Sequence, residues 1–249
     1  MGVRRWTGLT AAVLLSAART SGAQSAGNPP PGEDRQAADA AMHEMSHAGH
    51  DMASDPHLHL SAPVPALAAD TARARELVAT IRSALAIYRS VDTARADGYE
   101  QFLPNVPLPV YHFTNRRHGL EAAFGFDPAR PTSLLYRKNA DGSFTLTGVM
   151  YTAPRRLAEE TLDARIPRGI ARWHQHINWC IPKRGDEARW RETRDGKPVF
   201  GPLGPISDEK ACDAAGGRFL PHLFGWMVHV NAFESDDPKV IWGDHHDAH

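Results

Sequence analysis

Apolar and polar positions alternate with a period of two in two segments that also carry histidine. In residues 173–180, one face of an extended strand would present His174, His176, Asn178 and Cys180. Residues 225–231 repeat the arrangement, with one face presenting Met227, His229 and Asn231. The alternation predicts two β-strands that each display histidine from one side.

A helical period is found nearer the N-terminus. Large apolar side chains recur there every three or four residues and form one stripe: Leu77, Ile81, Leu85 and Tyr88. Asp70 is placed to cap this helix. A shorter turn is expected at 92–96, with Gly98 ending it. The pattern predicts an amphipathic helix with one face available for packing.

Strand and turn residues dominate beyond Tyr99. Residues 133–137 and 144–151 flank the sequence Asn-Ala-Asp-Gly at 139–142, which is typical of a β-hairpin. A polar excursion then follows the first histidine strand, with a short helix expected over 207–215. We expect an α+β fold in which the N-terminal amphipathic helix packs on an antiparallel β-sheet or small β-sandwich.

The two ends of the chain differ in composition from its centre. Residues 1–23 combine Arg4 and Arg5 with a short apolar run and small residues, the pattern of a cleaved signal peptide. We therefore expect a periplasmic or secreted protein with no stable membrane span after cleavage. Residues 24–69 predict a disordered His/Met-rich linker. A single metal-binding domain is expected over 70–243, followed by a His-rich tail at 244–249.

Charge and cysteine content narrow the range of partners. The formal net charge is -1 and no long basic run is present, which argues against nucleic acid as a partner. The chain has two cysteines, Cys180 and Cys212, for which an exported protein favours a disulfide. The alternative is that Cys180 is a thiolate ligand beside His174 and His176, because the alternation places it on their face.

The histidine strands predict a metal site. Residues two apart on a strand are about 6.6 to 6.8 Å apart at Cα, so imidazoles that lean together can reach one ion. His174 and His176 meet this condition. A third ligand must come from another strand, and the candidates in order of preference are His229, His112 and His222. The alternative is that these histidines are partly buried polar residues that hydrogen-bond within the sheet.

A biased tract suggests which metal would bind. Its donors are the thioethers and imidazoles of Met42, His43, Met45, His47, His50 and Met52. Thioethers favour copper(I), whereas imidazole also accepts copper(II), zinc and nickel. We therefore expect a copper ion as cofactor, with zinc or iron as alternatives. A metal-donor or metal-acceptor protein is a possible partner.

Three resemblances accompany these motifs. The Met/His tract resembles the His- and Met-rich segments of periplasmic copper-handling proteins. The two histidine strands, WHxHxNxC and GWMVHV, together with residues 131–136, resemble a group of exported bacterial proteins of unassigned activity, which implies no catalytic residue. The pair His174 and His176 with a distant third histidine is similar to the cupin metal pattern. A cupin, however, has a glutamate shortly after the pair, where Asn178 and Cys180 stand here.

Two functions fit these residues. The first is an exported metal-binding protein with a His-ligated site between two strands and flexible Met/His arms for metal capture or transfer. The second is a metal-dependent periplasmic oxidoreductase or hydrolase with an open coordination position. The nearest carboxylates after the second strand, Glu234, Asp236 and Asp237, lie in a turn-like run, so no general base is evident. A sheet domain whose histidines hold no metal is the third reading.

Overall fold

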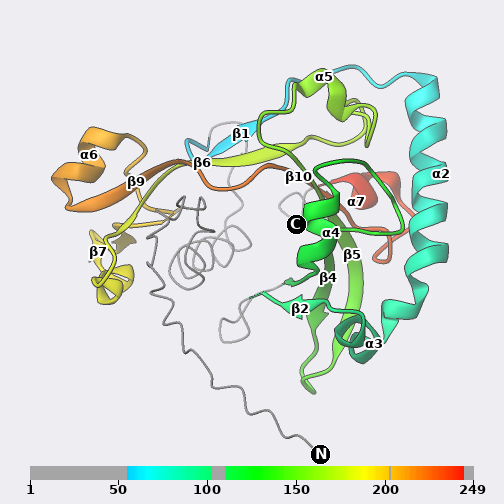
Figure 1. Cartoon of the computed structure of the whole chain (residues 1–249), viewed down its shortest axis with the longest axis horizontal. Coiled ribbons are helices and arrows are strands. Elements are labelled where there is room, and N and C mark those ends of the chain that lie inside the picture. The colour runs from blue at the N-terminus through cyan, green and yellow to red at the C-terminus, as the bar shows by residue number, and fades with distance from the viewer. Residues whose placement is uncertain (1–54, 103–109, 202, 244–249) are drawn as a thin grey trace, which may run out of the picture. The chain divides into compact units, whose positions relative to one another are not determined.

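The computed structural model describes residues 55–102, 110–201 and 203–243 (Figure 1). In this part of the chain the main sheet is antiparallel and has the strand order β1-β6-β10-β5-β4-β3-β2, with β9 also paired to β6. Its strands are β1 (Leu58–Leu60), β2 (Glu100–Gln101), β3 (Tyr111–Thr114), β4 (Ser133–Lys138), β5 (Phe144–Ala153), β6 (His174–Pro182), β9 (Gly217–His222) and β10 (Trp226–Val230). The sheet is open. With the helices below, it confirms the α+β expectation.

The helices are short apart from the first one. They are α2 (Ala68–Leu85), η1 (Ala86–Arg89), α3 (Val91–Ala96), α4 (Arg116–Glu121), α5 (Glu159–Leu162), η2 (Glu187–Arg191), α6 (Glu209–Ala214) and α7 (Pro238–Trp242). The expected apolar stripe is buried, with Leu77, Ile81 and Leu85 in α2 and Tyr88 in η1. The helix begins at Ala68 rather than at a cap on Asp70. Asp70 instead lies in the first turn, where its carboxylate accepts a hydrogen bond from the Leu67 N–H at 3.0 Å.

The two faces of the sheet have different partners. On one face, Ile81 and Leu85 of α2 share a hydrophobic core with side chains of the central strands, among them Tyr136, Val149, Tyr151 and Val228. The alternate residues of those strands point the other way and include Leu135, Met150 and Met227, which form a separate small cluster. The histidines of β3, β6 and β10 lie in alternation with the core residues. The fold therefore separates its core from its histidines by using opposite sides of one sheet.

Strand β6 changes partners at Asn178. Its first residues pair with β1 and, through His174, with β10, whereas residues 177–182 pair with β9. Asn178 has a φ of 58°, a left-handed conformation that interrupts strand alternation. Cys180 is consequently buried with Val199, Phe200 and Cys212, away from the histidines. The expectation that one face carries all four residues from His174 to Cys180 is wrong for this reason.

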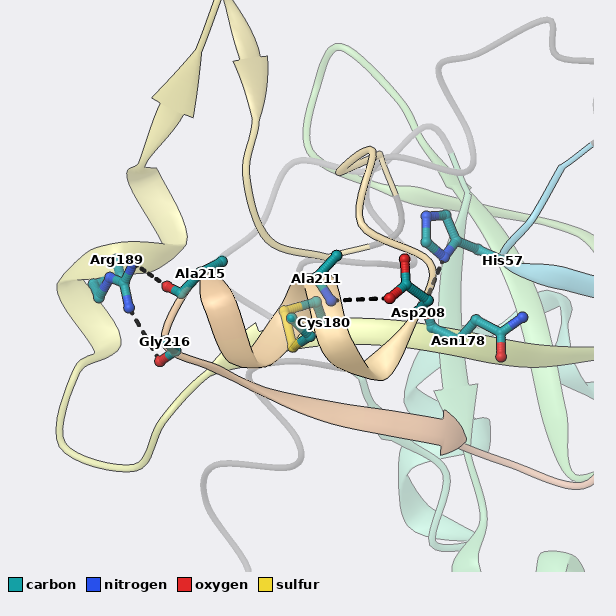
Figure 2. The surroundings of a disulfide bond; sticks show 9 residues. His57, Asn178, Cys180, Arg189, Asp208, Ala211, Ala215 and Gly216 are labelled. Atoms are coloured by element: carbon teal, nitrogen blue, oxygen red, sulfur yellow. Dashed lines mark hydrogen bonds between the residues drawn. A yellow bond between two sulfur atoms is a disulfide. The ribbon is translucent and has the colours of Figure 1, made fainter.

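The polar excursion after β6 is folded around a disulfide (Figure 2). Cys180 and Cys212 are joined, with Cα atoms 5.4 Å apart, as predicted. Asp208 caps α6 by accepting from the Ala211 N–H at 2.9 Å. Arg189 donates to the carbonyls of Ala215 and Gly216 at the other end of α6, at 2.9 and 3.2 Å. A two-stranded ribbon, β7 (Thr193–Arg194) with β8 (Lys197–Pro198), completes this segment.

Residues 55–67 differ from the disordered linker predicted over 24–69. Strand β1 pairs with β6 so that Leu58 lies opposite His176 and Leu60 opposite His174. His57 and Ser61 beside it are buried. The composition of this segment indicated disorder because it contains few large apolar residues. The segment is ordered instead by backbone hydrogen bonds to the edge of β6, which composition does not report.

Several sequence predictions fall on residues outside the described part of the chain. These are the signal peptide, the linker up to residue 54 with its Met/His tract, and the tail at 244–249. Within the described ranges, no helix is both long enough and apolar enough to cross a membrane.

Candidate metal centre

Four histidines from three strands meet on the sheet face opposite α2. His112 comes from β3, His229 from β10, and His174 and His176 from β6. Strands β3 and β10 are three strand intervals apart, about 14 Å at ordinary spacing. The Nε2 atoms of His112 and His229 are nevertheless 3.4 Å apart. The sheet therefore curves enough to bring its distant strands together at this point.

The four rings form a continuous series. Centroids are 5.5 Å apart for His112 and His229, for His229 and His174, and for His174 and His176. Imidazoles bound to one tetrahedral ion through about 2.0 to 2.1 Å bonds would have centroids roughly 5 Å apart. The spacing within each pair is thus close to that of shared ligands. The predicted pair and the first two candidates for a third ligand are all brought together.

The contact between His112 and His229 admits two readings. A nitrogen–nitrogen distance of 3.4 Å is long for a hydrogen bond, which would be weak at this separation. Two nitrogens on a tetrahedral ion with bonds of about 2.0 to 2.1 Å are themselves about 3.4 Å apart. The observed distance therefore suits two donors directed at a common cation as well as it suits a weak hydrogen bond.

His176 is the most enclosed member of the series. Its residue is 1% exposed, and the rings of Trp179 and Phe224 lie 5.5 and 6.0 Å from its own. Its Nδ1 is buried and has no hydrogen-bond partner among the described residues. Burial, followed by the positive charges that His174, His112 and His57 would carry, holds its pKa well below the usual value. The ring is therefore neutral near pH 7, the form that metal ligation requires.

The donor atoms are gathered but are not already set at ligand positions. In the described ranges, no group of three or more His, Cys, Asp or Glu side chains has an arrangement that could hold a metal ion. Cys180 is excluded as a thiolate ligand because it is in the disulfide with Cys212. Any ion would have to draw the four imidazoles inward by rotation of their side chains.

The remaining histidines have other surroundings. His222, the third candidate ligand, is on β9 opposite Ile177 and is exposed. Partial burial, then the charges of Arg155 and His59, lower its pKa. His57 is buried, with its ring nitrogens 3.0 Å from the Asn178 carbonyl and 2.9 Å from the Gly204 carbonyl. His59 faces Glu159 at 3.4 Å. His57 and His59 thus help to hold β1 and the residue before it against the rest of the protein, an arrangement called the β1 attachment below.

The tryptophans divide between the site and the core. Trp179 packs against His176. Trp173 and Trp226 instead belong to the core on the α2 side, where their indoles donate to the carbonyls of Ile166 and Leu157 at 3.0 and 3.1 Å. Of these three described tryptophans, Trp179 is therefore the one that packs against a histidine of the cluster.

Two methionines and a pocket adjoin the cluster and were not anticipated as a unit. Met150 lies opposite His229, and Met227 lies opposite His174. Both also line a pocket of about 330 Å³ whose other walls include Phe102, Phe224, Thr132 and Thr152. Met227 could be found from its alternation with His229, whereas nothing in the sequence around Met150 indicates that it faces a histidine.

Comparison with protein-family models, curated proteins and solved structures gives no match to this chain. Its site therefore has to be interpreted from its own geometry and donor chemistry.

Proposed function

We propose that this protein is an exported metal-binding protein that holds copper at the cluster of His112, His174, His176 and His229. The observation that carries the proposal is the convergence of His112 and His229, whose Nε2 atoms lie 3.4 Å apart although their strands are not neighbours. His174 and His176 are buried beside them, and a bound cation would offset the free energy that burying these polar rings costs.

The choice of copper depends on chemistry beyond the four rings. Imidazole alone serves copper, zinc and iron, so the cluster does not discriminate among them. The tract at residues 42–52 adds thioethers, which favour copper(I). In this proposal the tract and the C-terminal histidines capture metal, or exchange it with a donor or acceptor protein, and the cluster holds it.

Metal content of purified variants tests this function. The parent should be a full-length chain in which His43, His47, His50, His245, His246 and His249 are replaced by Gln and Met42, Met45 and Met52 by Leu. Retained metal would then report the cluster rather than the tracts. We expect about one copper per chain by elemental analysis and a loss of most of it in His174→Ala/His229→Ala.

The matched control is His222→Ala, since His222 is exposed and lies outside the ring series. It should retain the parent's metal. If the double variant is folded by circular dichroism and still retains the parent's stoichiometry, the cluster is not the site. Zinc or iron in place of copper would correct the identity of the ion while leaving the site in place.

The pocket beside Met150 and Met227 favours a second candidate, a metal-dependent enzyme. It could admit a small apolar molecule next to the cluster. The carboxylates considered as a base are occupied elsewhere: Glu234 pairs with Arg137, Asp236 pairs with Arg82, and Asp237 caps α7. This function would be supported if the parent showed turnover in oxidase or esterase screens and a folded His176→Ala variant did not. Equal behaviour of the variant and the parent would oppose it.

A further inference from the structure

The histidine cluster is continuous with two buried thioethers. Met150 on β5 lies directly opposite His229 on β10. Met227 on β10 lies directly opposite His174 on β6. Residues directly opposite on antiparallel strands have Cβ atoms about 4.5 to 5.5 Å apart and share a face. A methionine side chain is long and unbranched, so each sulfur can reach the imidazole opposite.

The location of these methionines sets them apart from the packing of the main core. Met150 is 6% exposed and Met227 is 4% exposed, and they cluster with Leu135, Val110 and Phe224 on the face that bears the histidines. Phe224 in turn packs against the ring of His176. The thioethers therefore lie beside the buried His174 and His176, while His112 and His229 complete the cluster as half-buried residues.

A site that places buried thioethers beside imidazoles suits one class of cation. Thioether sulfur is a soft donor that selects copper(I) over divalent first-row ions. A monovalent ion also loses less hydration energy than a divalent ion when neutral donors bind it away from water. We infer that Met150 and Met227 are soft ligands of the cluster and make it selective for monovalent copper. This inference rests on the proposed function, because it requires that the histidines bind metal.

The alternative is that both methionines only fill space in an apolar cluster. Substitution of both by leucine distinguishes this packing role from a role as sulfur ligands. Leucine for methionine conserves apolar volume, usually at a cost below about 1.5 kcal/mol, but it removes the sulfur. The test uses the tract-substituted full-length chain described above, so that Met150 and Met227 are the remaining candidate thioethers besides Met1. Copper(I) affinity is measured anaerobically by competition with bicinchoninate, and zinc affinity by competition with a chromophoric chelator.

We expect Met150→Leu/Met227→Leu to weaken copper(I) binding at least tenfold while zinc affinity stays within about twofold of the parent. X-ray absorption of the copper(I)-loaded parent should show a sulfur scatterer that the variant lacks. Thermal unfolding of the apo-proteins verifies that the variant is folded.

The two proposals fail in different ways. If the parent binds neither ion, both the metal-binding function and the thioether role are wrong. If the parent binds metal and the folded leucine variant keeps its copper(I) affinity, only the thioether role is wrong. A parallel loss of copper(I) and zinc would show that the methionines support the shape of the site without contributing sulfur, and it would also overturn the inference.

Discussion

Asn178 shows how one residue can set the geometry of a strand. Its left-handed backbone, with φ of 58°, lies where β6 exchanges β1 and β10 for β9. Its carbonyl lies 3.0 Å from the His57 Nδ1 (Figure 2). Its side-chain amide donates to the Pro56 carbonyl at 3.1 Å. A neutral His57 ring can donate to only one of its two carbonyl neighbours at a time. The kink and the β1 attachment are thus held by the same pair of residues.

Substitution at Asn178 should distinguish its backbone role from its side-chain role. Asn178→Gly keeps easy access to positive φ and loses the amide bond to Pro56, at a cost of about 1 kcal/mol. Asn178→Ala loses the same bond and also strains the backbone, for a total of about 2 to 3 kcal/mol. Urea unfolding followed by tryptophan fluorescence measures both variants. Equal stability of the glycine and alanine variants would show that the positive φ is not required.

At the scale of elements, β9 and α6 are held close to β6 by the disulfide. Gly217, the first residue of β9, lies against both sulfurs, and a Cβ there would be 2.5 Å from the Cys180 Sγ and 2.8 Å from the Cys212 Sγ. The Phe200 ring would be 2.9 Å away on another side. Glycine is required here by lack of space rather than by its backbone angles.

Gly217→Ala should therefore destabilise the protein by overpacking, at a cost of about 1 to 3 kcal/mol. Gly125→Ala is the matched control, because a Cβ at Gly125 meets nothing within 4 Å. The control should change the free energy of unfolding by no more than about 0.5 kcal/mol. Thermal and urea denaturation measure both. A Gly217→Ala variant as stable as the control would mean that the disulfide can shift without cost.

Elements with a strong local pattern were predictable, and those defined by their partners were not. The stripe of α2, the β4–β5 hairpin and the two histidine strands were all indicated by periodicity and turn residues. Strand β1 was missed because it depends on an edge of β6, and β9 because its pairing follows the kink at Asn178. Local pattern does not report strand order or curvature.

The candidate site was predictable to the same extent. Strand alternation identified His174, His176 and His229, and it ranked His112 next. That His112 reaches His229 depends on the curvature of four strands, which no short segment encodes. Cys180 was placed on the wrong face because the left-handed backbone of Asn178 could not be anticipated from an asparagine within an otherwise regular alternation.

At the scale of the whole molecule, the described residues have more than one hydrophobic cluster. The main one joins α2 to the sheet, whereas a smaller one surrounds the disulfide and includes Val199 and Phe200. The segment between β6 and β9 relies on this smaller cluster and on the Arg189 bonds to the end of α6. Regions with fewer buried apolar contacts open at lower free energy than the core.

Removal of the disulfide in Cys180→Ser/Cys212→Ser should thus act unevenly. The chain-entropy model assigns about 3.7 kcal/mol to closing a loop of this length. Hydrogen exchange measured by mass spectrometry should show protection lost first in α6 and β9, while β4 and β5 stay protected. Uniform loss of protection across the chain would show instead that the two clusters unfold as one unit.

The attachment of β1 has a consequence for the chain that precedes it. Because Leu58 lies opposite His176, the backbone at His57 is fixed beside the strand that bears the cluster. Met52 is five residues before His57, so covalent geometry limits their Cα separation to about 18 Å, whatever path the chain takes. If the tract binds copper as proposed, a cation released from Met52 would start within this distance of His57. Tethering of this kind makes a handover depend on effective concentration rather than on diffusion from bulk solution.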